Sequence, residues 1–212
     1  MSHDHPLLGY FERAAVGQFP DADGGVTMLP ALPSGRNAVV AFTGHAVIAT
    51  DLDATALADL VVDGFGQAQS PKVLLRLARG GTIDIIDATL VGRGHGGGVL
   101  PVTSEFDDHP RVVYARTLRD DVMVHGDERG LVTISSGLAG RQEMSIELLD
   151  AAHGRGAGRA LITEALALVP DGELLFAAVS PGNARSLRAF LAVGFVPLCS
   201  EVNITPPRAG RA

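Results

Sequence analysis

The sequence predicts an α/β protein of the α+β type, with a mixed, mostly antiparallel sheet flanked by helices. Short strand-like runs joined by tight turns fill residues 111–149, which is typical of an antiparallel meander. Helical and strand-like runs then alternate from 157 to 204. Upstream, two β-branched runs flank Thr43-Gly44 within 37–50 and indicate a hairpin in an additional N-terminal α/β region.

Local signals predict the elements in order. In the first half we expect a helix within 7–19, the hairpin 37–50, helices over 54–63 and 70–80, and a strand over 82–91. Asp51 and Asp53 are candidate N-caps, and Ser70-Pro71 opens the next helix because Ser caps a helix start and Pro suits its first turn. In the second half we expect strands over 111–118, 121–125, 131–135 and 141–149, a helix over 157–169, a strand over 173–179, a helix over 184–193 and a last strand over 195–204.

A glycine-dense segment, Gly92–Gly98, separates the two halves. Such a loop can cradle a phosphate, but this one lacks the Lys-Ser/Thr ending of a P-loop. We therefore interpret it as a mobile connector and as an organisational boundary.

Composition disfavours several classes of protein. The 212 residues carry a formal net charge of -7, which disfavours nucleic-acid binding because phosphate is repelled. The single cysteine, Cys199, permits no intramolecular disulfide and no cysteine metal cluster. No run of 18 apolar residues occurs, and the first residues lack the features of a signal peptide. We therefore expect a cytoplasmic protein with neither a nucleic-acid nor a membrane partner.

One glycine-rich turn has the form of an anion site. An apolar strand ending at Leu149 runs into His153-Gly154-Arg155-Gly156-Ala157-Gly158-Arg159, which opens an amphipathic helix. Unpaired N–H groups and the dipole at a helix start favour a bound anion, and the three glycines allow close approach. The alternative is a glycine turn that only packs a helix against a sheet.

A second motif follows one strand later. Asn183 stands at the N-cap position of a helix, with Ser186 three residues on. Leu187, Phe190 and Leu191 then form an apolar stripe that ends at Gly194-Phe195.

Together the two motifs resemble the GNAT family of N-acetyltransferases. In that family a Glu-Leu-x-Val strand precedes [Gln/Arg]-x-x-Gly-x-[Gly/Ala], and Asn-x-x-[Ala/Ser]-x-x-x-Tyr-x-x-x-Gly-Phe comes later. Glu147-Leu148 is similar to the first element, and 153–158 is similar to the second with His153 replacing Gln or Arg. Asn183, Ser186 and Gly194-Phe195 keep the spacing of the third. The resemblance covers about 141–196, and we expect it to extend back to Arg111.

The resemblance implies a GNAT-like sheet that is splayed between two parallel strands, with the pantetheine arm of acetyl-CoA in the gap. The residues that it assigns to cofactor binding are Leu148, Leu149, Asp150, the signature turn His153 to Arg159, Asn183, Ser186 and Phe190. The acceptor implied is a primary amine of a small molecule or a peptide. The expected division is 1–105 as an atypical N-terminal region that helps to form the sheet and acceptor pocket, 106–204 as the acetyl-CoA-binding core, and 205–212 as a loose tail.

The sequence departs from the family in two places. Phe190 stands where the family commonly has a Tyr that serves the leaving thiolate, and Phe has no proton to give. The chain also has room for only one strand after Phe195, where the family usually has two. We hypothesise that the 37–50 hairpin or a second subunit, in a homodimer, covers the resulting sheet edge.

Glu143 and Glu147 are the candidate catalytic bases. They lie four residues apart on one predicted strand and so share a face, where two carboxylates could raise one pKa. The alternative is a solvated strand face with a salt bridge to Arg141. His45 and His125 are expected to be structural, and the histidine spacing predicts no metal site. His3 and His5 are expected to belong to a disordered start.

Three functions are compatible with these motifs. The first is an acetyl-CoA-dependent N-acetyltransferase. The second is a non-catalytic acyl-CoA-binding or regulatory module on the same fold, which Phe190 and the N-terminal region motivate. A nucleotide-binding protein is disfavoured because the glycine turn follows an antiparallel meander and does not open a βαβ unit.

Overall fold

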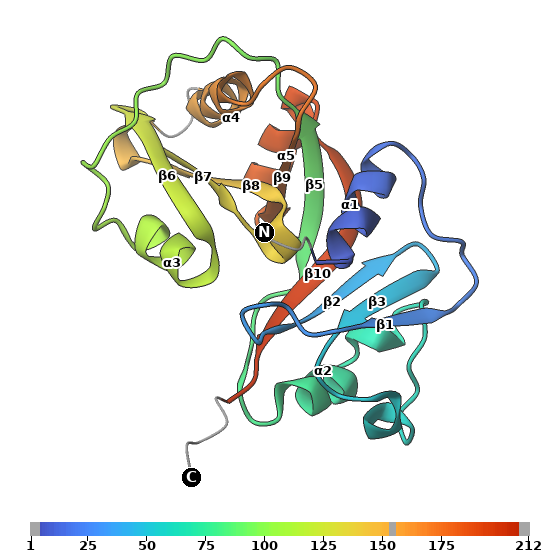
Figure 1. The fold of residues 1–212 in the computed structure, drawn as a ribbon. Helices are drawn as coiled ribbons and strands as arrows, with labels where there is room; N and C mark the ends of the chain where they lie inside the picture. Colours follow the sequence, from blue (N-terminus) through green and yellow to red (C-terminus); the bar gives the residue numbers. More distant parts are fainter. Residues whose placement is uncertain (1–4, 153–155, 208–212) are drawn as a thin grey trace. The chain divides into compact units, whose positions relative to one another are not determined.

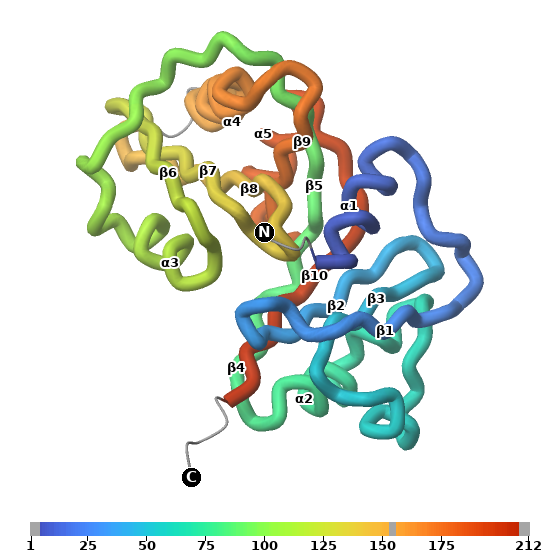
Figure 2. The backbone as a smooth tube through the Cα atoms, viewed as in Figure 1, coloured from blue at the N-terminus to red at the C-terminus, as the bar shows by residue number. Residues whose placement is uncertain are grey.

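The structure is a computed structural model of the 212-residue chain and describes residues 5–152 and 156–207 (Figures 1 and 2). The chain divides into two compact units. The first unit comprises Met1–Ala88 and Leu198–Ala212, and the second comprises Thr89–Pro197. Compactness alone does not define a folding domain, so the division predicted at residue 105 stays a prediction.

In the first unit the hydrogen-bonded strands follow the order β1-β3-β2-β10. Its elements are α1 (Leu7–Ala15), β1 (Val26–Leu29), β2 (Asn37–Phe42), β3 (His45–Ala49), the 3₁₀ helices η1 (Ala54–Leu57) and η2 (Gln67–Gln69), α2 (Pro71–Ala78), β4 (Thr82–Ile83) and β10 (Val196–Thr205). β1 and β3 are parallel, whereas β2 is antiparallel to both β3 and β10. β4 pairs with the end of β10.

The hairpin β2–β3 provides the partner that the last strand needs. Residues 200–204 of β10 pair with 37–41 of β2 in a regular antiparallel register. The hairpin thus occupies the edge at which the sequence lacks a second C-terminal strand. Val202 and Ile204 are fully buried in a cluster with Val39 of β2 and Leu77 of α2, so the last strand is part of the core of this unit.

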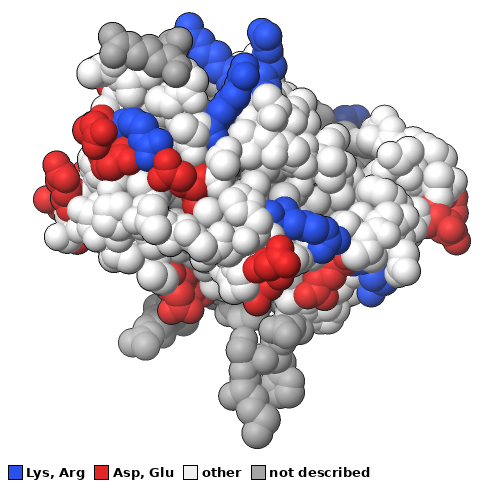
Figure 3. Space-filling model, turned by 90° about the horizontal axis from the view of Figure 1, so that it is seen from above, with Lys and Arg blue, Asp and Glu red and all other residues white. Residues whose placement is uncertain are grey.

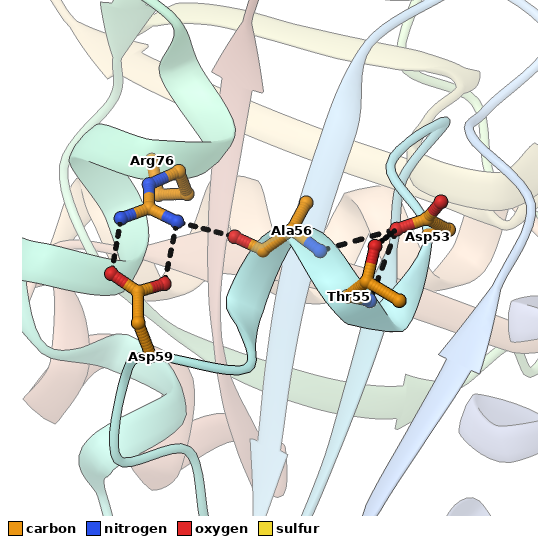
Figure 4. Close-up of polar contacts among 5 residues, drawn as sticks. All are labelled: Asp53, Thr55, Ala56, Asp59 and Arg76. Atoms are coloured by element: carbon orange, nitrogen blue, oxygen red, sulfur yellow. Dashed lines mark hydrogen bonds and ion pairs between the residues drawn. The ribbon is translucent and has the colours of Figure 1, made fainter.

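Two expectations for the first unit are wrong in extent. The helix expected over 54–63 is only the short η1, whose N-cap Asp53 accepts from the N–H groups of Thr55 and Ala56 (Figure 4). The helix does not continue because Arg76 of α2 donates to the Ala56 carbonyl and to both oxygens of Asp59. The strand expected over 82–91 is divided into β4 and β5 (Asp87–Arg93).

His5 is more ordered than expected. His5 is buried, its Nε2 lies 2.9 Å from the Pro30 carbonyl, and its Nδ1 accepts from the Leu7 N–H. It therefore anchors the start of α1. His3 and residues 208–212 of the predicted tail lie outside the described residues.

In the second unit the hydrogen-bonded strands follow the order β5-β9-β8-β7-β6. Its further elements are α3 (Pro110–Leu118), β6 (Asp120–Asp127), β7 (Gly130–Ser136), η3 (Leu138–Gly140), β8 (Gln142–Leu148), η4 (Asp150–Ala152), α4 (Ala157–Leu168), β9 (Leu174–Val179) and α5 (Ala184–Val193). β6, β7 and β8 form an antiparallel meander, and β9 is parallel to β8. The predicted class, a mixed and mostly antiparallel sheet flanked by helices, is confirmed.

The strand expected over 111–118 is wrong, because this segment forms the helix α3. His109 is its N-cap and accepts from the Arg111 N–H through Nδ1 (3.1 Å), and Pro110 occupies the first helical position. Val112 and Ala115, three residues apart, are its buried positions. The β-branched pair Val112-Val113 favoured a strand locally, but the helix start signal and the burial of one helical face prevailed.

The glycine-dense loop after β5 is fixed and is not the mobile connector that we expected. The N–H groups of His95, Gly96 and Gly98 donate to the Leu166, Val169 and Ala167 carbonyls at the end of α4. A side chain at Gly98 would lie 2.6 Å from the Ala167 main chain. The loop therefore satisfies carbonyls that a helix end leaves unpaired, and these donors do not form a phosphate cradle.

Candidate functional site

The candidate site lies where the two parallel strands of the second unit part. β8 and β9 share a single ladder pair, Glu143↔Phe176, although both strands continue toward their C-terminal ends. β8 is paired with β7 along its whole length over the same stretch. A gap in main-chain pairing therefore opens on the β9 side of β8, from about Ser145 onward.

Two residues of β8 turn their main-chain groups toward this gap. The Leu149 N–H donates to the Arg129 carbonyl (3.0 Å). Because hydrogen-bonded and non-hydrogen-bonded pairs alternate along an antiparallel ladder, this bond shows which residues of β8 bond to β7. By that alternation Ser145 and Glu147 bond to β7, whereas Ile146 and Leu148 face the β9 side. The Leu149 carbonyl accepts from the Ala152 N–H, so Ile146 and Leu148, rather than Leu149, offer groups to the gap.

The glycine turn leads from the end of β8 into α4. Gly156 is the N-cap of α4 with φ 79°, a left-handed conformation that favours glycine, and it has no side-chain cap. No acidic residue lies in the first turn of α4. A Cβ at Gly158 would be 3.5 Å from the Leu148 side chain, so the helix start lies against the end of β8. The predicted site residues His153, Gly154 and Arg155 lie outside the described residues.

The start of α5 is capped as the sequence predicted. The Asn183 side chain accepts from the Ser186 N–H (3.1 Å), so both residues serve the first helical turn. Arg159 near the start of α4 and Arg185 and Arg188 of α5 are exposed. Figure 3 shows several Lys and Arg side chains close together at one edge of the face seen from above, and others scattered over that face.

Phe190 belongs to the core of the unit. Only 3% of its surface is exposed, and its ring packs edge-on against Phe195 with 4.9 Å between the centroids. The position that carries a Tyr in the GNAT pattern is thus an apolar contact between α5 and the start of β10.

The face of β8 opposite α4 carries the two candidate carboxylates. Arg111 of α3 donates to Glu147 through Nε (3.1 Å) and Nη2 (2.9 Å), and both side chains are partly exposed. Glu147 thus stays accessible to solvent. Ser145 lies between the two carboxylates and bonds to Thr133 of β7 (2.7 Å).

Glu143 is buried in an ion cluster. Its carboxylate contacts Arg141 (2.8 Å) and Arg119 (2.5 Å), and its side chain is 4% exposed. Burial acts to raise the pKa of Glu143, but the charges of Arg141 and Arg119 and a hydrogen bond from the Leu138 main chain outweigh it, so the pKa is lowered. The predicted contact with Arg141 is confirmed, whereas the solvated face and the raised pKa are wrong at this residue.

Sequence reasoning missed the arginines that define this site. Arg111 was placed on a strand and Arg119 was assigned to no element, yet both pair with a candidate carboxylate. Arg129 pairs with Asp127 and, at 2.7 Å, with Glu164 of α4, which ties the meander to that helix. The His109-Pro110 start signal could have identified α3, but the sequence carries no signal for the Arg119–Glu143 pair.

The histidines expected to be structural do bond within the protein. His125 is buried, with Nδ1 3.0 Å from the Leu100 carbonyl, and His45 contacts Asp23 and Thr27. Within the described part of the chain, no group of three His, Cys, Asp or Glu side chains could hold a metal ion. The helices of residues 5–152 and 156–207 include none with the length and apolar character needed to cross a membrane.

Comparisons with known proteins give only a distant structural similarity. No family model matches the sequence, and no curated protein matches it. Among solved structures, the chain is similar to a GNAT-family protein from Novosphingobium aromaticivorans DSM 12444 that is provisionally described as an acetyltransferase. The sequences are 14% identical, the TM-score is 0.38, and the match covers 57% of this chain and 65% of that one, which is less than two thirds of its length. A TM-score this low does not establish a shared fold.

Proposed function

We propose that the protein is an acyl-CoA-dependent transferase that moves an acetyl group from acetyl-CoA to a primary amine of a small molecule or a peptide. The observation that carries this proposal is the parting of β8 from β9 after the single pair Glu143↔Phe176. The main-chain N–H and C=O groups of an interior strand are rarely left without a hydrogen-bond partner. An extended amide-bearing arm, such as pantetheine, is a suitable partner.

The ends of the gap fit the remainder of the cofactor. In this proposal Ile146 and Leu148 bind the pantetheine amides, and the N–H groups at the start of α4 hold the diphosphate, where the helix dipole favours an anion. Exposed Arg159 and Arg185 add positive charge close to the two helix starts. The sequence resemblance implies diphosphate binding at the same turn, which supports this proposal.

Glu147 is the better of the two carboxylates for proton transfer. It is partly exposed, whereas Glu143 is buried between two arginines and its pKa is lowered. In the proposed reaction Glu147 takes a proton from the ammonium acceptor, directly or through water, and the neutral amine attacks the thioester carbonyl. The C–S bond breaks, the thiolate leaves with the electron pair, and the attacking nitrogen loses its second proton to water to give the amide. Phe190 has no proton to give, so solvent protonates the thiolate.

A non-catalytic acyl-CoA-binding module is the second candidate, and the burial of Phe190 in the core favours it. Thiol release from acetyl-CoA with a panel of primary amines separates the two. Turnover supports the transferase. Stabilisation of the protein by CoA without turnover on any amine supports the binding module.

The cofactor site is tested by Gly156→Glu, with Gly172→Glu as its matched control. Both glycines have a left-handed φ (79° and 81°), and neither would bring a Cβ within 4 Å of another atom, so both variants carry the same strain and charge. Only Gly156 is at the start of α4. We expect Gly156→Glu to weaken CoA binding at least about tenfold in calorimetry, because an anion and a carboxylate then compete for one site. Equal CoA affinity in the two variants would contradict the placement.

A further inference from the structure

The first unit holds a hydroxyl, an imidazole and a carboxylate in series. Thr27 Oγ1 lies 3.0 Å from His45 Nε2, and His45 Nδ1 lies 2.8 Å from Asp23 Oδ1. A carboxylate at Nδ1 selects the tautomer that carries its proton there, so Nε2 is left as the acceptor for the Thr27 hydroxyl. The order nucleophile, base and orienting acid is the arrangement that activates a hydroxyl for attack.

Close main-chain contacts fix this triad. The Gly24 N–H donates to the Gly44 carbonyl (2.8 Å), and the Gly64 N–H donates to the Gly24 carbonyl (2.9 Å). A Cβ at Gly44 would lie 2.6 Å from Ala22, and one at Gly64 would lie 2.6 Å from the His45 Cα. Three loops therefore meet at a distance that only glycine permits. His45 lies at this junction, and Asp23 adjoins it.

The triad lies on the face of the sheet that α2 does not cover. Val26 and Met28 of β1, and Ala46 and Ile48 of β3, belong to the apolar cluster with α2. Because side chains alternate along a strand, Thr27 and His45 point to the other face. Thr27 is half-buried, and the His45 side chain is 12% exposed.

Aromatic side chains border the triad on that face. Phe42 is the cross-strand partner of His45, and it packs against Tyr10 and Phe19 with centroid distances of 6.3 and 6.5 Å. Phe19 is 47% exposed. An acyl or aryl group bound next to Thr27 would therefore have an apolar surface to lie on.

We propose that Thr27, His45 and Asp23 form a second reactive site, which takes the acyl group of small activated esters onto the Thr27 hydroxyl. Thr27 Oγ1 attacks the ester carbonyl while its proton passes to His45 Nε2. The ester C–O bond breaks, and the alcohol leaves with that electron pair and then takes the proton. Water, deprotonated by His45, releases the acyl group as a carboxylate and restores the hydroxyl. Asp23 is a positioning residue, and its bond to His45 is the main cause of the lowered pKa of its carboxyl.

The test uses p-nitrophenyl acetate with the full chain, and follows nitrophenolate release and the site of acetylation by peptide mass spectrometry. The chain has a single lysine, Lys72, so off-site acetylation is confined mainly to that residue, the α-amine and Cys199. We expect acetyl on Thr27, none in Thr27→Val, and retention in Thr27→Ser. His45→Gln should lower the acylation rate by about 100-fold.

Controls separate reactivity from folding. Thr55→Val removes a hydroxyl that bonds to Asp53 with no histidine beside it, and this variant should acylate like the wild type. Asp23→Asn should slow acylation and Asp23→Glu should restore part of the rate, with thermal unfolding measured for every variant. Acetyl found only on Lys72, the α-amine or Cys199, or equal Thr27 labelling in wild type and folded His45→Gln, would overturn the proposal.

Discussion

Glu143 and Glu147 are chemically identical, four residues apart and on the same face of β8, yet their surroundings give them different properties. Two arginines and a main-chain N–H enclose Glu143, and a side chain at Gly137 would lie 2.4 Å from its carboxylate. Glu147 has one arginine and remains partly exposed. The first therefore serves stability, and we assign proton transfer to the second.

For proton transfer, we expect Glu147→Gln to lower kcat with the best amine of the panel by about 100-fold, since general bases contribute at least that much. The CoA dissociation constant should not change, because glutamine can still accept a hydrogen bond from Arg111. Glu173→Gln, an exposed carboxylate of the same unit, is the control. Unchanged kcat in Glu147→Gln would mean that the base lies elsewhere.

Glu143 predicts a defined pH dependence of stability. Its folded pKa lies below the ordinary value of 4.5, so its contribution is complete above about pH 4.5 and is lost as the pH falls through the lowered pKa. At neutral pH, Glu143→Gln should cost about 3–5 kcal/mol of unfolding free energy, because two arginines lose their buried partner. Urea unfolding of both proteins from about pH 7 down to pH 3 measures this effect, and the difference in unfolding free energy between them should shrink in acid. A difference that stays constant with pH would contradict the assignment.

Among the elements, α4 is held at both ends by glycine segments that act differently. At its start Gly156 supplies a left-handed turn, and at its end the loop 94–98 supplies donors to the last carbonyls. In the proposed function the first binds the cofactor diphosphate through N–H groups, whereas the donors of the second are occupied by the carbonyls at the end of α4. Two glycine-rich segments of similar composition thus differ in function because of where they meet the helix.

We expect Gly98→Ala to destabilise the protein by about 1–3 kcal/mol, because its Cβ would lie 2.6 Å from the main chain of Ala167. Gly182→Ala is the matched control, since a Cβ there has only one neighbour, at 3.9 Å. Thermal unfolding of both variants measures the difference. Equal stability would show that the loop is not packed against α4.

Elements with strong local signals were predictable from the sequence. Ser70-Pro71 predicted the start of α2, and Asn183 and Gly194 predicted the two ends of α5. N-caps and left-handed C-caps are readable from the sequence because they act within a few residues. α3 was missed because its strand-like residues outweighed its start signal. The contact of Glu143 with Arg119 was beyond prediction, because Arg119 is distant in sequence and only the fold brings it near.

Across the whole molecule, the last strand ties the end of the chain to its beginning. Leu198, Val202 and Ile204 are buried, and β10 pairs along β2. We expect truncation after Pro197 to expose the β2 edge and cause aggregation in size-exclusion chromatography. Truncation after Pro207 should leave the protein monodisperse and its unfolding temperature unchanged. Monodisperse behaviour of the shorter chain would mean that β10 is dispensable.

The discontinuous first unit has a consequence during synthesis on the ribosome. Met1–Ala88 emerges long before Leu198, so the β2 edge must wait for its partner while Thr89–Pro197 is translated. At about 5–20 residues per second, this wait lasts roughly 5–20 s. In that interval the nascent hairpin presents an unpaired strand that a chaperone could shield or a neighbouring nascent chain could capture. The yield of folded protein should therefore depend on translation speed and on holdase chaperones.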